Sequence, residues 1–178
     1  NLEDAESRGA RIYGEVLGGD INCGGHRSGG SMTAPNPEGV QRCIRAAVKD
    51  SGIEPEEIDV INGHLTATGA DSSEVVSWSK ALGLGPEKFP LITSTKSMIG
   101  HALGAAGALE VVASMLMLDG SFVHPSINCE DVHPKVEDFA GSIPHTVEEL
   151  PQLSTIIKAG FGFGDVNVCA VFRKWLNN

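Results

Sequence analysis

The stretch LITSTKSMIGHALGAAGALEVVASMLML, residues 91–118, joins a short β-branched run to a charged turn and a long apolar segment. The run 91–95 predicts a buried strand, and the spacing over 102–118 predicts a helix. That helix is apolar on nearly all sides, so we expect it to lie between two layers of structure and not at the surface. The stretch therefore predicts one strand-to-helix unit of an α/β domain.

The rest of the chain extends this alternation of strands and helices. Apolar periodicity predicts helices over 37–51 and 71–82, each ended by a glycine. A loop is expected over 18–37, and the Pro-containing piece 122–128 reads as an edge or a loop. Further strands are predicted over residues 10–17, 58–62, 155–161 and 166–175, the last two forming a hairpin. The pattern predicts an α/β fold with a mixed sheet.

Composition excludes several classes of function. The 178 residues carry a net charge of −10, which disfavours nucleic acid and anionic membrane surfaces as partners. The four cysteines are widely spaced with no CxxC pair, so we expect neither a zinc site nor a disulfide framework. The run 102–118 is short for a membrane span and contains Glu110. The start of the chain gives no secretory address and suggests the later part of a longer chain.

Two of the six histidines stand out. His64 and His101 each follow a predicted strand by a few residues, among small or hydroxyl side chains. Ligand sites of open α/β sheets lie beyond the carboxyl ends of the strands, so the two can converge on one pocket. Two satisfied core histidines are the alternative. The other four are expected to be plain surface residues: His26, His124, His133 and His145.

Two charged residues are also costly in this setting. Lys96 follows a buried strand and Glu110 interrupts the apolar helix, so each is expensive unless paired. A buried Lys96–Glu110 ion pair would satisfy both, either as a purely structural pair or as one that also sets the state of His101. Glycines at 100, 104 and 107 share one side of the helix and predict close packing against a neighbouring element.

The tail segment GFGFGDVN, residues 160–167, places Phe161 and Phe163 between glycines at the bend of the predicted hairpin. The glycines permit positive φ, so we expect the two rings to point to opposite sides of a strand or to lie on a mobile loop. Lining of an apolar substrate channel and simple core filling both fit the residues.

Six segments together resemble the C-terminal half of β-ketoacyl-[acyl carrier protein] synthases, most closely the chain-elongating type II class. They are ESRGARIYGEVLG, MTAPNPEG, INGHLTATGAD, STKSMIGHALGAAGALE, HPSIN and GFGFGDVN, in order along nearly the whole of residues 1–178. The resemblance implies a thiolase-like fold, layered αβαβα, of which this chain is the C-terminal half. It also implies an acyltransferase of fatty acid biosynthesis that condenses malonyl-[acyl carrier protein] with an acyl-enzyme thioester and releases CO₂.

The resemblance assigns roles to particular residues. His64 and His101 would stabilise the oxyanion formed on decarboxylation, with Lys96 holding the environment of the second histidine. Thr66 and Thr68 would hydrogen bond to the pantetheine arm of the substrate, and Phe161 and Phe163 would line the acyl pocket. Structural support would come from Glu110, Asp71 and Glu74. No metal and no bound cofactor are implied, because phosphopantetheine of the acyl carrier protein delivers the substrates.

Three departures qualify the resemblance. The family reads HGTST with an acidic residue eight positions after the histidine, whereas HLTATGAD has Leu65 and an acid after seven. The usual FGFGG ends here in Asp165. The nucleophilic cysteine belongs to the N-terminal half, and we assign none of the four cysteines that role.

The expected partners are the acyl carrier protein, the N-terminal half and a second copy in a homodimer, in the cytoplasm or an organelle stroma or matrix. Arg8, Arg11 and Arg45 are candidates to meet an acidic carrier. A non-catalytic partner subunit like a chain-length factor is the first alternative. A thiolase that condenses without decarboxylation is the second, although thiolases replace one histidine by cysteine.

Overall fold

The computed structural model describes residues 1–27 and 29–176. Its α-helices are α1 Leu2–Ser7, α2 Pro37–Ser51, α3 Asp71–Leu82, α4 Lys96–Ile99 and α5 Ala106–Gly120. The strands are β1 Gly14–Cys23, β2 Val60–Asn62, β3 Leu91–Thr93, β4 Phe122–Val123, β5 Glu148–Glu149, β6 Thr155–Gly162 and β7 Val166–Lys174. Short 3₁₀ segments are η1 Pro55–Glu57, η2 Pro86–Lys88, η3 Leu103–Ala105 and η4 Pro134–Ser142.

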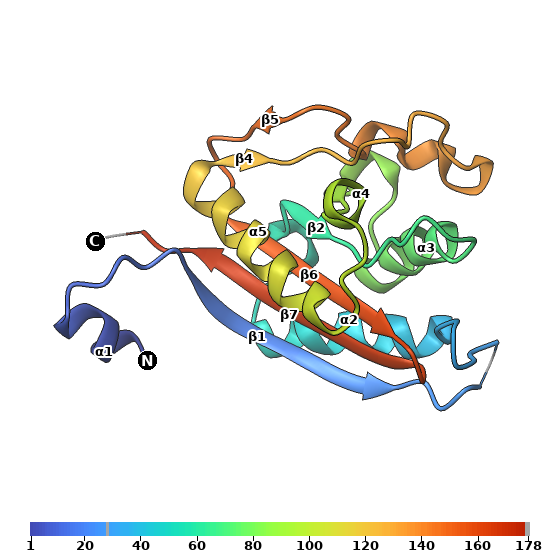
Figure 1. Ribbon diagram of the computed structural model, residues 1–178, viewed down its shortest axis with the longest axis horizontal. Helices are drawn as coiled ribbons and strands as arrows, with labels where there is room; N and C mark the ends of the chain where they lie inside the picture. Colours follow the sequence, from blue (N-terminus) through green and yellow to red (C-terminus); the bar gives the residue numbers. More distant parts are fainter. Residues whose placement is uncertain (28, 177–178) are drawn as a thin grey trace.

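A five-stranded mixed sheet forms the centre of the chain, in the order β1-β7-β6-β2-β3 (Figure 1). The strand β2 runs parallel to both β3 and β6. The hairpin partners β6 and β7 are antiparallel, and β1 pairs antiparallel with β7 at the edge. The predicted mixed sheet and C-terminal hairpin are confirmed. A separate pair, β4 and β5, lies beyond the end of α5.

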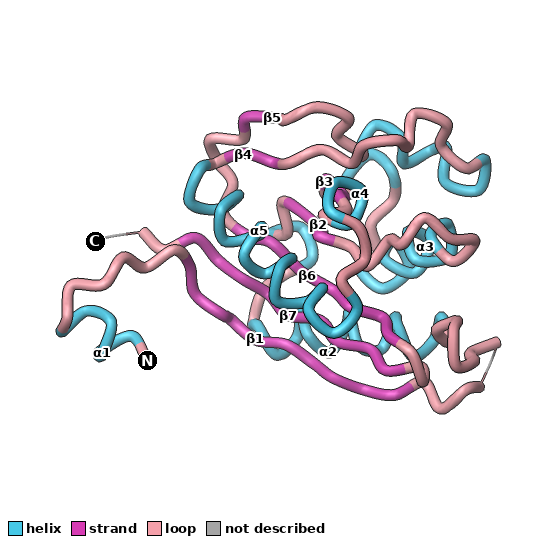
Figure 2. Tube along the Cα trace, in the orientation of Figure 1, coloured by secondary structure: helices cyan, strands magenta, loops and turns pink. Residues whose placement is uncertain are grey.

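Helices cover both faces of this sheet (Figure 2). On one face, α2 and α3 pack with alternate residues of β6, including Ile157, Ala159 and Phe161, in the larger core. On the other face, α5 contributes Met117 and Leu118 to a smaller core. Because side chains of a strand alternate between faces, the residues of β6 between those three face α5.

Local signals set the ends of α2 as predicted. The Asn36 side chain accepts a hydrogen bond from the Glu38 backbone N–H at the N-terminus, and Pro37 occupies the first turn. Gly52 ends the helix in the left-handed conformation, with φ of 66°. The helix predicted over 71–82 coincides with α3.

The prediction of a loop from residue 18 onward is wrong for its first six residues. The strand β1 continues to Cys23, pairing with β7 across an irregularity between Val16 and Gly18. A Cβ atom at Gly19 would lie 2.6 Å from the Cys169 carbonyl oxygen, so only glycine permits this approach of the two strands. Glycines that suggest a loop therefore serve a close strand pairing.

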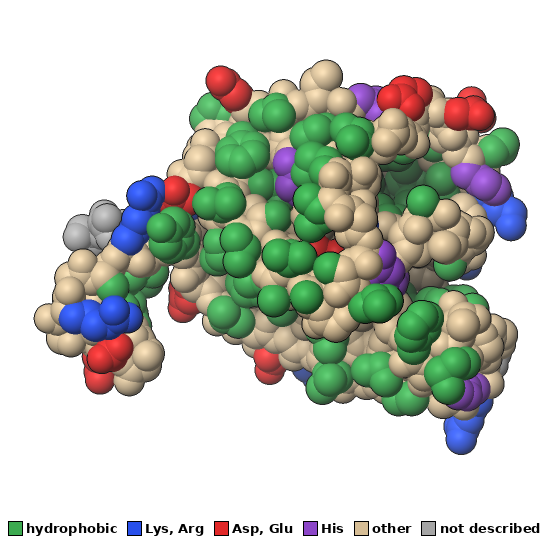
Figure 3. Space-filling view, viewed as in Figure 1, with side chains coloured by type: hydrophobic (Ala, Val, Ile, Leu, Met, Phe, Trp, Pro, Cys, Tyr) green, Lys and Arg blue, Asp and Glu red, His purple; other side chains and the backbone are tan. Residues whose placement is uncertain are grey.

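The expectation that α5 is buried on all sides is also wrong within the described residues. Its outward side chains Leu109, Val112 and Leu116 are 43%, 57% and 51% exposed. Apolar side chains gather over this face of the molecule (Figure 3). By length and composition alone, Leu103–Gly120 is long enough to cross a membrane, yet its inner side packs on the sheet as a core helix does.

The glycines at 100, 104 and 107 do not pack closely against another described element. No atom lies within 4 Å of the position that a Cβ would occupy at any of the three. Gly104 and Gly107 instead line a cavity. The absence of side chains there leaves open space, which is the opposite of the predicted contact.

Candidate active site

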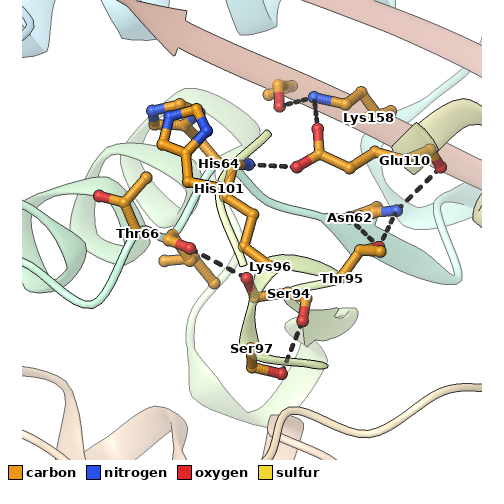
Figure 4. Close-up of polar contacts among 12 residues, drawn as sticks. Asn62, His64, Thr66, Ser94, Thr95, Lys96, Ser97, His101, Glu110 and Lys158 are labelled. Atoms are coloured by element: carbon orange, nitrogen blue, oxygen red, sulfur yellow. Dashed lines mark hydrogen bonds and ion pairs between the residues drawn. The ribbon is translucent and has the colours of Figure 1, made fainter. Parts of the chain in front are cut away.

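The two singled-out histidines meet at one cavity. His64 lies two residues after β2, and His101 lies between α4 and η3. Their ring centroids are 5.5 Å apart with the planes at 85° (Figure 4). Both line a cavity of about 1240 Å³ whose wall is mostly apolar. Parallel strands β2 and β3 end at the same sheet edge, which is why residues 37 positions apart converge there.

His64 is held in place through its backbone. Its N–H donates to Glu74 Oε1 at 2.7 Å, and the next N–H, of Leu65, donates to Glu74 Oε2 at 2.9 Å. Burial, together with the nearby charges of Lys96 and Lys158, lowers the pKa of His64 to about 3. The imidazole is therefore neutral at physiological pH. Burial also raises the pKa of Glu74 to about 7.

A backbone contact fixes the tautomer of His101. The Leu103 N–H donates to His101 Nδ1 at 3.1 Å, so Nδ1 acts as an acceptor. A neutral imidazole that accepts at Nδ1 carries its proton on Nε2. Leu103 reaches this position with a φ of 49°, outside the usual range for its residue type. The loop thus leaves His101 with a free N–H donor on its far nitrogen.

A buried cluster of charges lies beside the histidines. The predicted Lys96–Glu110 pair is present through Glu110 Oε1, and Lys158 Nζ lies 2.5 Å from Glu110 Oε2. The three side chains are at most 5% exposed. Figure 4 shows both lysines directed at the one carboxylate. Sequence reasoning missed Lys158, although a lysine in the apolar run TIIKAGFG carries the same cost that identified Lys96.

A second missed residue is His124, which was expected at the surface. It is 7% exposed, and its Nδ1 and Nε2 lie 3.0 and 2.9 Å from the hydroxyls of Thr93 and Thr95. Burial lowers its pKa. Thr95 also hydrogen bonds to Asn62, whose side chain donates to the Glu110 carbonyl oxygen. His124 therefore belongs to the polar support behind the ion cluster. The other three histidines are exposed, as predicted.

The shortened HLTATGAD segment forms a tight turn around one carboxylate. Asp71 accepts hydrogen bonds from the backbone N–H groups of Thr66, Ala67 and Thr68, at 3.1, 3.0 and 3.3 Å. The two threonine hydroxyls lie 3.2 Å apart and both residues line the cavity. Asp71 thus compensates for the missing residue by closing the loop on the first turn of α3.

The two phenylalanines of the hairpin differ sharply. Phe161 is 4% exposed, with its ring 6.1 Å from that of His64 and 6.4 Å from that of Trp78. Phe163 is 69% exposed, and both line the cavity. Phe161 joins the core to the histidine pair, whereas Phe163 lies at the open part of the wall.

Asp165 connects the hairpin bend to the loop that follows β1. It is fully buried with a φ of 63°. Its carboxylate accepts from the backbone N–H groups of His26 and Asn36 at 2.9 and 2.7 Å, and its carbonyl oxygen accepts from Gly24 at 2.8 Å. The neighbouring residues Thr33 to Pro35 line the cavity. Asp165, which replaces the family glycine, therefore links the hairpin bend to the loop after β1, and both segments border the cavity.

Other candidate residues lie away from this cavity. All four cysteines are free thiols. Among residues 1–27 and 29–176, no group of three or more His, Cys, Asp or Glu is arranged to hold a metal ion. Arg8 and Arg11 pair with Asp4 and Asp119 at 3.2 and 2.5 Å, so acids of this chain already match their charges.

A mixed sheet covered on both faces, with two histidines at the ends of its parallel strands, defines half of a thiolase-like domain. Solved structures agree with this. The ishigamide ketosynthase/chain length factor matches with a TM-score of 0.87 and 34% identity, over 98% of this chain and 41% of that one. A type II polyketide ketosynthase in complex with its acyl-carrier protein matches with a TM-score of 0.85 and 32% identity, over 99% and 42%.

The family model for the beta-ketoacyl synthase C-terminal domain matches residues 13–130. The chain belongs to this family. It is 39% identical over 175 residues to 3-oxoacyl-[acyl-carrier-protein] synthase 1 of Haemophilus influenzae, covering 98% of this chain and 40% of that relative. It is 40% identical over 177 residues to the chloroplastic synthase II of Arabidopsis thaliana, covering 98% and 31%. The chain thus spans two fifths or less of these relatives.

Proposed function

We propose that this chain is the C-terminal half of a 3-oxoacyl-[acyl carrier protein] synthase and supplies its decarboxylation site. The observation that carries the proposal is the His64–His101 pair, with ring centroids 5.5 Å apart at the wall of one large cavity. Both rings are reached from the ends of neighbouring parallel strands, and His101 presents an Nε2–H donor. Two such donors form a site for a developing negative charge.

The chemistry needs that site in its first step. The bond between the malonyl carboxylate and its α-carbon breaks, CO₂ leaves, and the electron pair passes to the thioester oxygen as an enolate. Hydrogen bonds from the two imidazoles stabilise this oxygen, each worth about 3–4 kcal/mol in comparable oxyanion sites. Neutral imidazoles suit the task, and burial beside two lysines keeps His64 neutral.

The second step requires the other half of the enzyme. The enolate carbon attacks an acyl thioester on a cysteine, the new carbon–carbon bond forms, and the cysteine leaves as a thiolate. We assign that cysteine to an N-terminal half that covers the exposed apolar face of α5. Contact with that half would remove the apolar side chains of Leu109, Val112 and Leu116 from water and place α5 between two layers. The complete enzyme is proposed to be a homodimer.

Substrate positioning falls to the cavity wall. Thr66 and Thr68 offer hydroxyls to the phosphopantetheine arm of the acyl carrier protein, and Phe161 and Phe163 border the acyl chain. The arm brings the reactive thioester, so the reaction needs no bound metal or redox cofactor. A ketosynthase in complex with its acyl-carrier protein is among the structures similar to this chain. Bacterial and chloroplastic relatives favour the cytoplasm or a stroma as the compartment.

The test is malonyl-carrier decarboxylation by the full-length protein. His101→Ala removes one donor and is expected to lower the rate by about 100- to 1,000-fold. His133→Ala, at an exposed histidine, is the matched control and should leave the rate unchanged. A rate for His101→Ala within about threefold of wild type, under 1 kcal/mol, would exclude the oxyanion role. Absence of a nucleophilic cysteine in the N-terminal half would favour the chain-length-factor alternative.

A further inference from the structure

Lys158 occupies an unusual place in the sheet. It lies in the middle of β6, opposite Asn62 of β2 in the parallel register, and is 4% exposed. Its neighbours Ile157 and Ala159 belong to the core under α2 and α3, so Lys158 faces α5. There its Nζ lies 2.5 Å from Glu110 Oε2 and donates to the Ala159 carbonyl oxygen.

The ion cluster contains one cation more than pairing requires. Lys96 alone neutralises Glu110, through Oε1. Lys158 adds a second buried ammonium, so two positive charges share one carboxylate and the cluster carries a net charge of +1. Burial lowers the pKa of Lys158, and the charge of Glu110 opposes that shift. An apolar side chain at 158 would avoid this cost of burial. A costly group at a site wall is a candidate for function.

The extra charge lies where the proposed reaction takes place. Lys158, Glu110, His64 and His101 line the same cavity. The charged and titratable groups around His64 come from four elements: Lys96 of α4, Lys158 of β6, His101 before η3, and Glu74 of α3, which accepts from its backbone. During decarboxylation, negative charge leaves the malonyl carboxylate and builds on the thioester oxygen near the histidines. A fixed cation on that side favours the transition state over the ground state.

We propose that Lys158 is a positioning residue of the condensation site, whose ammonium gives the Lys96–Glu110–Lys158 cluster its net positive charge and favours the enolate. The proposal rests on the decarboxylation function proposed above. A structural role would be different, because Lys158 would then contribute to stability and its charge would not affect the histidines.

The experiment compares Lys158→Met and Lys158→Arg in the full-length protein, with Lys80→Met, an exposed lysine of α3, as the matched loss of one charge. The measurements are malonyl-carrier decarboxylation against pH and thermal unfolding. Lys158→Met is expected to lower the plateau rate by about tenfold, as loss of one nearby charge would. The acid limb of the pH–rate profile of Lys158→Met, where activity falls as His64 is protonated, should move to higher pH. Without the nearby ammonium, His64 is protonated more readily. The unfolding temperature should stay equal or rise.

Lys158→Arg should keep the acid limb at its wild-type pH, and Lys80→Met should change neither measurement. Three results would overturn the proposal: a rate for Lys158→Met within about twofold of wild type, a lowered unfolding temperature with an unmoved acid limb, or an acid limb shifted as far by Arg as by Met. A Lys158→Met protein recovered only unfolded also counts against it. His101→Ala in the same assay separates the cases, since an unaffected rate there rejects the decarboxylation function itself.

Discussion

The sharing of Glu110 by two lysines predicts a marked asymmetry among substitutions in the cluster. Lys96→Met or Lys158→Met leaves the carboxylate with one partner, so a neutral pair remains. Glu110→Gln leaves two ammonium groups at 5% exposure with no counter-ion. The glutamate substitution should therefore be far more destabilising than either lysine substitution, although each removes one charge.

The magnitude follows from the burial of all three groups. Removal of one partner of a buried ion pair typically costs about 3–5 kcal/mol, because the other charge stays desolvated. In Glu110→Gln two buried charges carry that penalty, so we expect the free energy of unfolding to fall by about 5 kcal/mol. For a domain of this size, 1 kcal/mol shifts the unfolding temperature by about 2–4 °C, which gives a drop of 10 °C or more. Each lysine substitution should change it by about 2 °C or less.

The assay is thermal unfolding of the full-length protein at two pH values. In Glu110→Gln the buried lysines lose their proton more easily than in the unfolded chain, so their folded pKa is depressed below 10.5. The unfolded state then binds more protons than the folded state, and stability rises with pH up to that value. The loss of thermal stability of Glu110→Gln relative to wild type should therefore be smaller at pH 9 than at pH 7. The triple substitution with Lys96→Met and Lys158→Met should recover most of the loss.

Two results would refute this reasoning. A cost for Glu110→Gln no larger than for Lys96→Met would mean that the carboxylate does not hold both cations. A deficit that stays constant from pH 7 to pH 9 would mean that no lysine titrates in response.

Two further predictions concern other carboxylates. Asp165→Asn keeps a residue type that tolerates positive φ. It leaves the partly buried backbone N–H of His26 or the buried one of Asn36 unpaired, at a cost of about 1–3 kcal/mol. Lower thermal stability and faster proteolysis within 24–36 are expected, and equal stability would contradict it. The raised pKa of Glu74, about 7 against 4.5 unfolded, means that its stabilising contribution is present below pH 4.5 and lost as pH rises through 7. Relative to wild type, Glu74→Gln should therefore gain stability between pH 5 and pH 8, measured by urea unfolding, and a constant difference would reject the shift.

The sequence predicts much of this fold because its local signals agree with the final structure. Asn36, Pro37 and Gly52 mark the ends of α2, and two runs rich in β-branched and aromatic residues mark the hairpin of β6 and β7. Errors occurred where tertiary contacts decide. Gly18 and Gly19 suggest a loop until the approach of α2 to Gly18 and of β7 to Gly19 is known. No local pattern distinguishes a glycine that permits contact from one that leaves space.

The candidate site was partly predictable for a similar reason. The cost of burial identified Lys96 and Glu110, and the ends of strands identified His64 and His101. The same cost applies to Lys158. From the sequence, however, Glu110 is already paired with Lys96, and only the structure shows that its carboxylate contacts two lysines. His124 was missed because a Pro-containing loop normally lies at the surface. This loop instead contacts the end of β3, where His124 hydrogen bonds with Thr93.

The buried Asp165 has a consequence for engineering. Its carboxylate joins residues of two segments more than 100 positions apart in sequence, the loop at 24–36 and the bend at 161–165. A chimera that transplants the bend from a glycine-bearing relative, without the loop, would leave two backbone N–H groups unmatched. The reverse graft would bury an acid with no donors. The two segments should therefore be exchanged together, as one unit of recombination.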